Sequence, residues 1–204
     1  MGERLTRDAV VDAAVTIVES DGLDALSMRA LSEKLDVAVT SIYWHVGNKD
    51  ALLDALVDRM SMAIVADAPS GSSPRERVSW VACGVRDALE AHGQLVAIAQ
   101  QRGRLATVFA PARRSLAVEL HRAGLRGERL ADGANTVLQY VAAYCTTMSV
   151  MARSPGQDPS GVPLWDGPPP VDRAAARRLQ DAPDPVRCFE IGLDLVVRGL
   201  VASA

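Results

Sequence analysis

The stretch SMRALSEKLDVAVTSIYWHVGNKDALL, residues 27–53, carries the strongest structural signal in the chain. Ser27 is placed to cap a short helix over 28–35, because a serine oxygen accepts from the free amide groups of a helix start. A turn at 36–37 separates this helix from a second short one over 39–45. Two short helices joined by a tight turn predict a helix-turn-helix motif.

Longer helices flank this motif on both sides. A helix over 7–20, capped by Thr6, precedes it, and its apolar residues recur along one face. A Gly-Asn pair separates the motif from a fourth helix, over 49–65. We therefore expect a three-helix domain over residues 1–48 and a second helical domain over 49–204, with the fourth helix connecting the two.

The second domain also follows a helical pattern, after a linker of proline, glycine and serine at 69–74. Residues 154–170 hold six of the eleven prolines, so we expect an irregular loop there. Further turns are expected at Gly93, at Ala110-Pro111 and at 124–127. Helices are predicted over 75–92, 94–102, 108–123, 128–153, 171–180 and 185–202. The expected fold class is all-α, with about nine to ten helices.

Composition supports packed helices. Hydrophobic residues make up 49% of the 204 residues, but Phe, Trp and Tyr only 4%, so Leu, Val and Ala must fill the core. The net charge is −3, and residues 1–60 hold six Lys or Arg against eleven Asp or Glu, which does not favour nucleic-acid binding. This argument is weak, because only the local field at a docking face matters and more distant charges are screened within about 10 Å.

The sequence lacks the signals of membrane insertion and export. No apolar run approaches the roughly 18 to 20 residues of a membrane span, and the N-terminus has no apolar signal region. We therefore expect a soluble, cytoplasmic protein with no membrane partner. Cys83, Cys145 and Cys188 lie in apolar helical stretches without a C-x-x-C pair, which favours buried reduced thiols over a redox sensor.

The runs 27–31 and 41–56 resemble the DNA-binding domain of the tetracycline repressor family, above all in Tyr-Trp-His-Val-x-Asn-Lys. The similarity is strong over residues 5–58. Residues 189–193 also resemble the last helix of that family, whereas the middle of the chain matches in its helical pattern alone. The resemblance implies an N-terminal helix-turn-helix DNA-binding domain and a ligand-sensing, dimerising C-terminal domain.

Residue chemistry at the motif agrees with this implication. Tyr43, Trp44 and His45 place three polar-tipped rings on a short helix where a core would prefer leucine, so phosphate oxygens are suitable partners. The alternative is that one or two of these rings pack between helices, Trp44 more readily than Tyr43. Lys49 stands in a helix first turn, where the dipole disfavours a cation unless an anion such as phosphate is near. A solvated lysine without a role is the alternative there.

By analogy with the family, Arg29, Val39 and Thr40 are the expected base contacts, with Arg29 the best candidate for a guanine. Val39 and Thr40 differ from the polar-Pro pair of the tetracycline-repressor subfamily, which implies a different operator. Capping of a helix is a second role for Ser27. The expected phosphate contacts are Ser27, Ser41, Tyr43, Trp44, His45 and Lys49.

The family's C-terminal domain carries an effector pocket whose occupation changes the spacing of two DNA-reading domains. The effector here is an unknown small molecule, and tetracycline with magnesium is not expected, because the fourth helix has no ligand histidine. We expect no metal and no cofactor. The candidate pocket residues are Met60, Ile64, Trp80, Phe109, Tyr140, Tyr144 and Met148, for which an ordinary core position is the alternative.

A homodimer is expected, because a DNA-binding domain of this size reads only a half-site and needs a two-fold partner about 34–36 Å away. The interface is predicted on the helices over 128–153 and 185–202, with Phe189, Leu193, Val196, Val197 and Leu200. The predicted function is thus a repressor released from a palindromic operator by a small molecule. An enzyme is disfavoured by the lack of catalytic motifs, and a small-molecule binding protein without DNA affinity is the second alternative.

Overall fold

The computed structural model describes residues 5–64, 68–153, 165, 167–168, 170–180 and 184–201. Within these ranges the chain is almost wholly helical and has no strand, which confirms the expected all-α fold. In chain order the elements are α1 (Arg7–Asp21), the short 3-10 helix η1 (Leu23–Ala25), α2 (Met28–Leu35), α3 (Val39–Val46), α4 (Lys49–Ala63), α5 (Pro74–Ala91), α6 (Gly93–Gln101), α7 (Leu105–Arg122), α8 (Gly127–Arg153), α9 (Arg173–Gln180) and α10 (Pro185–Val201).

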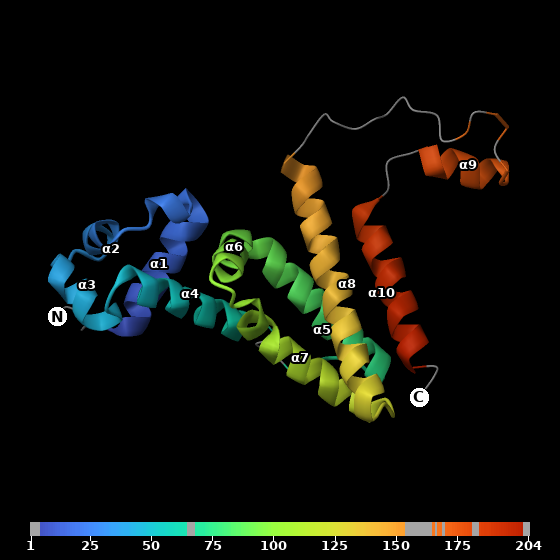
Figure 1. The fold of residues 1–204 in the computed structure, drawn as a ribbon, viewed down its shortest axis with the longest axis horizontal. Coiled ribbons are helices and arrows are strands. Elements are labelled where there is room, and N and C mark those ends of the chain that lie inside the picture. The colour runs from blue at the N-terminus through green and yellow to red at the C-terminus, as the bar shows by residue number, and fades with distance from the viewer. Residues whose placement is uncertain are drawn as a thin grey trace.

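The molecule is elongated, with a group of short helices at one end and a bundle of longer helices at the other (Figure 1). One end is the head, which we define as α1, η1, α2 and α3, and the other is the body, defined as α5 to α10. Helix α4 packs against α1 and α3 near its start and against α6 and α7 further along, so it belongs to both. The division of the chain near residue 48 stays a prediction.

Local chemistry explains the helices of the head. The Thr6 hydroxyl accepts a hydrogen bond from the Ala9 amide at 3.1 Å, and the Ser27 hydroxyl accepts one from the Ala30 amide at 3.0 Å, which satisfies free donors at the starts of α1 and α2. Asp36 adopts a left-handed conformation with φ 52°, and this residue makes the tight turn into α3.

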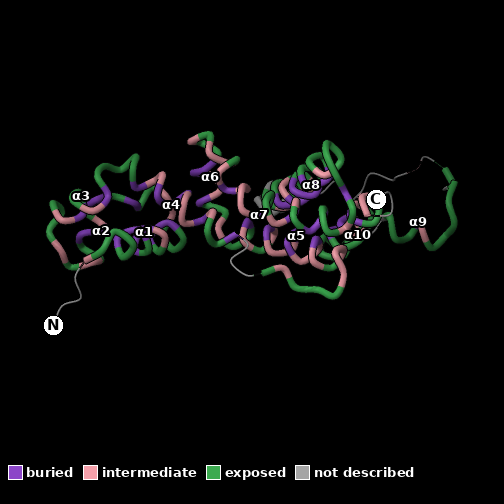
Figure 2. The backbone as a smooth tube through the Cα atoms, turned by 90° about the horizontal axis from the view of Figure 1, so that it is seen from below, coloured by how far each residue is buried: buried purple, intermediate pink, exposed green. Residues whose placement is uncertain are grey.

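An aliphatic core holds the head together and continues into α4. Val10 and Val18 of α1, Leu31 of α2, Ile42 of α3 and Leu56 of α4 are all fully buried. Burial of each such side chain stabilises the fold by about 1.5–3 kcal/mol. The buried residues of α3 are Ile42 and Val46, which lie on its inner face. Figure 2 shows this buried strip passing from the head along α4, with exposed backbone on both sides.

The structure differs from the sequence prediction around Pro111. A turn was expected there, but α7 begins at Leu105 and continues through Pro111. Val108 and Ala112 beside the proline are fully buried, and this packing outweighs the one helix hydrogen bond that proline cannot donate. The actual break lies earlier, at Gly103, whose φ of 66° favours glycine.

The body buries α10 against α5 and α8, which lie beside it in Figure 1. Phe189 of α10 is fully buried, with the rings of Tyr140 and Tyr144 of α8 at 5.6 and 4.7 Å between centroids. The Tyr140 hydroxyl donates to the Phe189 carbonyl at 2.9 Å. The loop expected over 154–170 falls almost entirely outside the described residues.

The cysteines are free thiols in three different environments. Cys145 is buried, Cys83 is half-buried and Cys188 is exposed near the start of α10. The expectation of burial is therefore wrong for Cys188, because the outer side of α10 has no covering element in the described part of the chain.

Gly192 is required where Tyr140 crosses α10. A Cβ added at Gly192 would overlap the Tyr140 hydroxyl and lie 2.8 Å from its Cζ. We expect Gly192→Ala to destabilise the protein by about 1–3 kcal/mol, as overpacked cores do, which thermal unfolding would measure.

Gly84→Ala in α5 is the matched control, because nothing lies within 4 Å of an added Cβ there. This control should leave the stability unchanged or raise it, since alanine favours a helix over glycine by about 1 kcal/mol. Equal stability of the two variants would show that Tyr140 does not sit against α10 as described.

Candidate DNA interface and ligand cavity

Helix α3 presents aromatic side chains to solvent at the free end of the head. The residue exposure of Trp44 is 77% and that of Tyr43 is 50%, while Ile42 and Val46 on the other side of α3 are buried. His45 is half-buried and meets Trp44 edge to face, with 4.6 Å between ring centroids. The alternative in which Trp44 packs between helices does not occur.

The first turn of α3 is also open. Val39 and Thr40 are exposed, and Ser41 is half-buried. No side chain caps this helix start, because its N-cap residue is Ala38. The three positions thus lie on the same exposed end as the aromatic pair, beside free backbone amide groups that favour an anion.

Arg29 lies on α2 and is almost fully exposed, with 84% of its side chain accessible. Its Nε donates to Glu33 Oε1 at 2.9 Å, and this partner raises the pKa of Arg29 further above its usual value. Ion pairs between exposed side chains are weak, so a guanine or a phosphate can compete with Glu33 for the guanidinium. Sequence reasoning selected Arg29 but did not foresee this partner, although the i, i+4 spacing is a usable signal.

Lys49 has a structural role that the sequence did not indicate. Its Nζ donates to the Leu26 carbonyl at 2.9 Å, which ties the start of α4 to the segment before α2. Ser27 meanwhile caps α2, as its alternative role proposed. Both residues are exposed at the residue level, so a phosphate contact stays a prediction for each.

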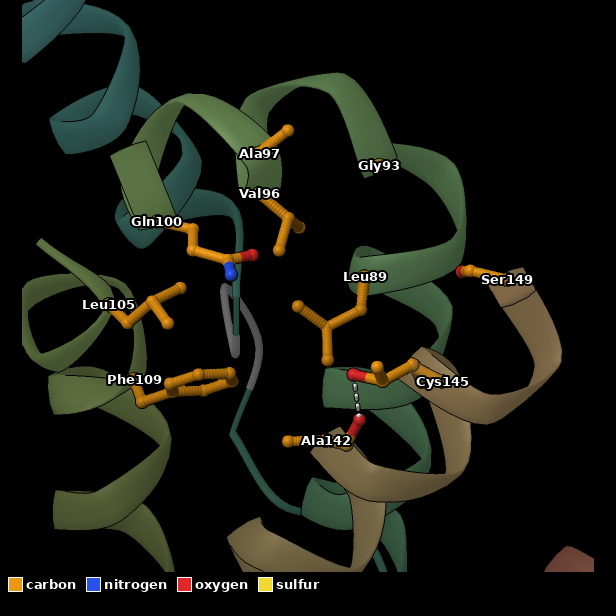
Figure 3. A pocket seen from close by; sticks show the side chains of 11 residues that line it. Leu89, Gly93, Val96, Ala97, Gln100, Leu105, Phe109, Ala142, Cys145 and Ser149 are labelled. Carbon is orange, nitrogen blue, oxygen red and sulfur yellow. Dashed lines mark hydrogen bonds between the residues drawn. The ribbon is translucent and has the colours of Figure 1, made fainter. Parts of the chain in front are cut away.

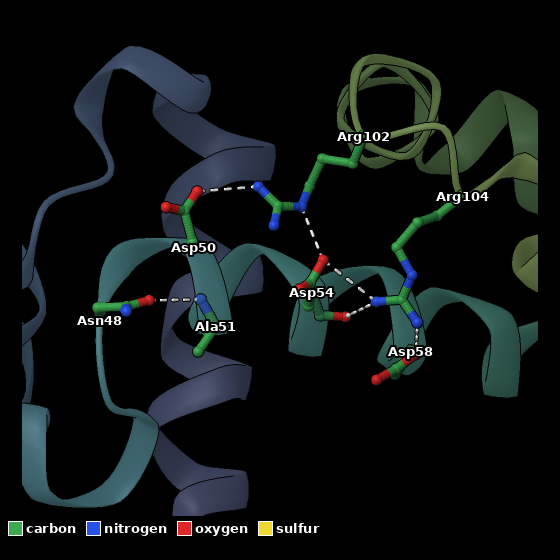
Figure 4. Close-up of polar contacts among 7 residues, drawn as sticks. All are labelled: Asn48, Asp50, Ala51, Asp54, Asp58, Arg102 and Arg104. Carbon is green, nitrogen blue, oxygen red and sulfur yellow. Dashed lines mark hydrogen bonds and ion pairs between the residues drawn. The ribbon is translucent and has the colours of Figure 1, made fainter.

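Two arginines flanking Gly103 clamp α4 to the body (Figure 4). Arg102 Nε lies 2.7 Å from Asp54 Oδ1, and Arg102 Nη1 lies 3.0 Å from Asp50 Oδ1. Arg104 Nη2 lies 2.8 Å from Asp58 Oδ1, and its Nη1 donates to the Asp54 backbone carbonyl.

We call this network the α4 clamp: Arg102, Arg104, Asp50, Asp54 and Asp58. The hydrogen bond from Arg102 is the main reason that the pKa of Asp54 lies below its usual value, so Asp54 stays ionised at neutral pH. The aspartates recur every four residues on one side of α4, yet their partners lie about fifty positions away in sequence. The pairing was therefore not predictable from the sequence.

A cavity of about 230 Å³ lies in the body between α5, α6, α7 and α8 (Figure 3). Its wall is largely apolar, with one amide side chain, from Gln100, pointing inward in the figure. The lining residues are Leu89, Gly93, Val96, Ala97, Gln100, Leu105, Phe109, Ala142, Cys145, Thr146 and Ser149.

The predicted pocket residues do not come together at this cavity. Phe109 lines it, and Met60 lines a second cavity between α1, α4 and α6. Ile64 is fully buried, Tyr140 and Tyr144 pack on Phe189, and Trp80 and Met148 are half-buried elsewhere. Apolar character alone could not separate pocket from core, since both present the same residue types.

The predicted interface residues of α10 stay a prediction, and most of them face the inside of the protomer. Phe189, Leu193 and Val197 are buried inside the protomer, and Val196 and Leu200 pack partly against its core. The exposed apolar side chains of α10 are instead Val186, Ile191 and Leu195, at 56, 50 and 65%. The helix is apolar around most of its circumference, so the sequence could not tell the inner face from the outer one.

Two features are absent from the described residues. Across residues 5–64, 68–153 and the described C-terminal segments, no three His, Cys, Asp or Glu side chains gather as metal ligands. None of the helices described is both long enough and apolar enough to cross a membrane.

Known proteins resemble the N-terminal part of the chain in sequence. Residues 10–56 match the family described as bacterial regulatory proteins, tetR family. The chain is 37% identical over 98 residues to an HTH-type transcriptional regulator of Saccharopolyspora erythraea, covering 48% of this chain and 42% of that protein. It is 42% identical over 77 residues to the tetracycline repressor protein class D of Escherichia coli, covering 38% and 34%. The chain thus spans less than half the length of these two curated relatives.

Solved structures resemble the whole chain. Apo ActR from Streptomyces coelicolor has a TM-score of 0.73 and 28% identity, covering 99% of this chain and 97% of ActR. ActR in complex with actinorhodin has a TM-score of 0.70 and 29% identity, covering 99% of both chains. BioQ with its natural double-stranded DNA operator has a TM-score of 0.60 and 27% identity, covering 98% and 99%.

Proposed function

We propose that the chain is a DNA-binding transcriptional regulator of the tetR type, because residues 10–56 match that family of bacterial regulatory proteins and the whole chain resembles ActR in fold. More specifically, it acts as a repressor that a small-molecule effector releases from a palindromic operator. The observation that carries the proposal is the exposed Tyr43–Trp44 pair on α3, which is held from behind by a buried apolar face. A regulator of this kind works on the chromosome, so the proposal implies a cytoplasmic protein without enzymatic activity.

The head supplies two kinds of DNA contact. Arg29, Val39 and Thr40 read base edges, and a bidentate arginine on guanine is the commonest specific contact in the major groove. Side chains around them bind the backbone and hold the register without reading sequence. The phosphate contacts proposed are Ser27, Ser41, Tyr43, Trp44, His45 and Lys49. BioQ, whose structure holds operator DNA, supports a DNA-binding role for a head of this fold.

The cavity in the body is the proposed effector site, and the α4 clamp is the proposed link to the head. Gln100 and Leu105 line the cavity, while Arg102 and Arg104 between them hold the aspartates of α4. An occupant that displaces residues 100–105 also displaces the clamp, because its two arginines lie within this same segment. The complex of ActR with actinorhodin supports small-molecule binding in such a body.

A homodimer is the proposed assembly. A head of this size reads a half-site, so a palindrome requires two copies about one helical turn apart. The outer face of α10 offers Ile191 and Leu195, one helical turn apart, to a second copy, at the end of the molecule away from the head (Figure 1). Exposed apolar patches of this kind mark association surfaces.

Operator binding can test the roles of the head residues. A duplex selected from random sequences by the purified protein serves as operator, and a scrambled duplex serves as reference. We expect Tyr43→Ala to weaken both by a similar factor, because backbone contacts are independent of sequence. Arg29→Ala should weaken operator binding by about tenfold or more and the reference much less, which a titration at fixed salt would measure.

Arg113→Ala, an exposed arginine of α7, is the matched control and should leave both affinities unchanged. An unchanged ratio of operator to reference affinity in Arg29→Ala would contradict the assignment of Arg29. A wild-type protein that retains no duplex at any salt concentration would favour the second candidate, a small-molecule binding protein, which the acidic excess in residues 1–60 suggests.

The dimer face can be tested at Leu195. Its side chain is 65% exposed in the protomer, so Leu195→Glu should fold normally but place two charges in the proposed interface. We expect sedimentation analysis to give a dimer for the wild type and a monomer for this variant at micromolar concentration.

Val118→Glu is the control for the dimer experiment, since Val118 is an exposed valine of α7, at 49%. This variant should remain dimeric. A Leu195→Glu protein that stays dimeric at the same concentration would refute the proposed interface.

A further inference from the structure

The wall of the cavity between α5 and α8 holds no charged side chain. Of its eleven lining residues only Cys145 can ionise below pH 12, and burial raises the pKa of this thiol to about 11, so it is neutral at pH 7. The ionic groups that act on Cys145 are Glu90, Arg86 and Asp87 of α5, and Arg86 is paired with Asp87 at 2.6 Å. The cavity itself therefore offers no counter-ion.

This neutrality restricts the ligand. An ionised carboxylate, phosphate or ammonium group held against this wall would lose part of its hydration without gaining an opposite charge from the lining, which is unfavourable. A metal chelate is also unfavourable, because the described parts of the chain hold no group of three His, Cys, Asp or Glu that could bind its metal ion. The ligand that fits is uncharged.

The shape of the cavity restricts its size. A volume of about 230 Å³ lies below the usual range for drug-sized ligands, about 300–1,000 Å³, so one or two fused rings fill it. Figure 3 shows the Phe109 ring, Leu89 and Leu105 directed toward a common space, with Val96 above them. An aromatic wall of this kind favours a ring packed against Phe109.

Polar groups restrict the orientation of the ligand. Gln100 is an exposed residue whose carboxamide points into the cavity from α6, and this side chain makes no hydrogen bond among the described residues. On the opposite wall, the Thr146 hydroxyl donates to the Ala142 carbonyl at 2.8 Å and so has only acceptor capacity left. Gln100 can both donate to a ligand and accept from it, as can the hydroxyl of Ser149 elsewhere in the lining.

We infer that the ligand of this cavity is an uncharged, largely apolar molecule of one or two fused rings, carrying a hydroxyl or carbonyl group that hydrogen-bonds to Gln100. The inference rests on the proposed function in taking the cavity for the effector site. It goes further in naming the chemical class of the ligand and the side chain that orients it.

Two matched probes test the inference by isothermal titration at pH 7. We expect 2-naphthol, which is neutral, to bind the full-length protein at least about tenfold more tightly than 2-naphthoate, which is ionised. Gln100→Leu keeps the volume but removes both hydrogen-bonding groups, and it should weaken 2-naphthol about five- to tenfold. Gln101→Leu, at the neighbouring exposed position, is the control and should bind as the wild type does.

Three results would overturn the inference: equal or tighter binding of 2-naphthoate, no binding of either probe, or Gln100→Leu binding 2-naphthol as tightly as Gln101→Leu. The proposed function fails separately. If 2-naphthol binds with the expected pattern but operator affinity is the same with and without it, the ligand class stands and the role of the cavity as effector site is in doubt.

Discussion

The largest set of ion pairs between α4 and the body, in the described part of the chain, joins one turn to one helix, and a separate contact joins Glu19 of α1 to His92 before α6. Arg102 and Arg104 flank Gly103, and they hold three aspartates that recur along α4. Helix α4 also belongs to the hydrophobic core of the head, through Leu52 and Leu56, so a displacement of α4 moves the DNA-reading end with it. Without the clamp, α4 would be joined to the body mainly by apolar contacts, which are not directional.

The ion pairs of the clamp are weak enough for a ligand to rearrange them. Its side chains are partly exposed to solvent, where individual ion pairs contribute little and long side chains exchange partners readily. A ligand can therefore rearrange the clamp with a small part of its binding free energy. Coupling free energies between two sites in a protein are typically about 1–3 kcal/mol. The core under α3 is by contrast fully buried, so the reading surface itself stays rigid while its position changes.

Sequence reasoning was accurate where structure is local. Caps at Thr6 and Ser27 and apolar periodicity predicted the helices of the head to within a residue or two, and the exposure of Trp44 followed from its polar-tipped ring. It failed where the answer depends on partners far along the chain. No periodicity relates the positions joined by the hydrogen bond from Lys49 to the Leu26 carbonyl or by the α4 clamp. The same holds for the residues that line the cavity. The inner and outer faces of α10 were likewise indistinguishable, since both are apolar.

The most direct test of the account is the distance between the two heads of the proposed dimer. A spin label at Asp24→Cys, an exposed position of η1, can be introduced after replacing the native cysteines with alanine, and pulsed electron resonance then gives the distribution of distances. The account predicts one narrow distribution for the intact clamp and a clearly broader one for Arg102→Ala combined with Arg104→Ala. Distributions of equal width would contradict it, because α4 would then be held in place without the clamp.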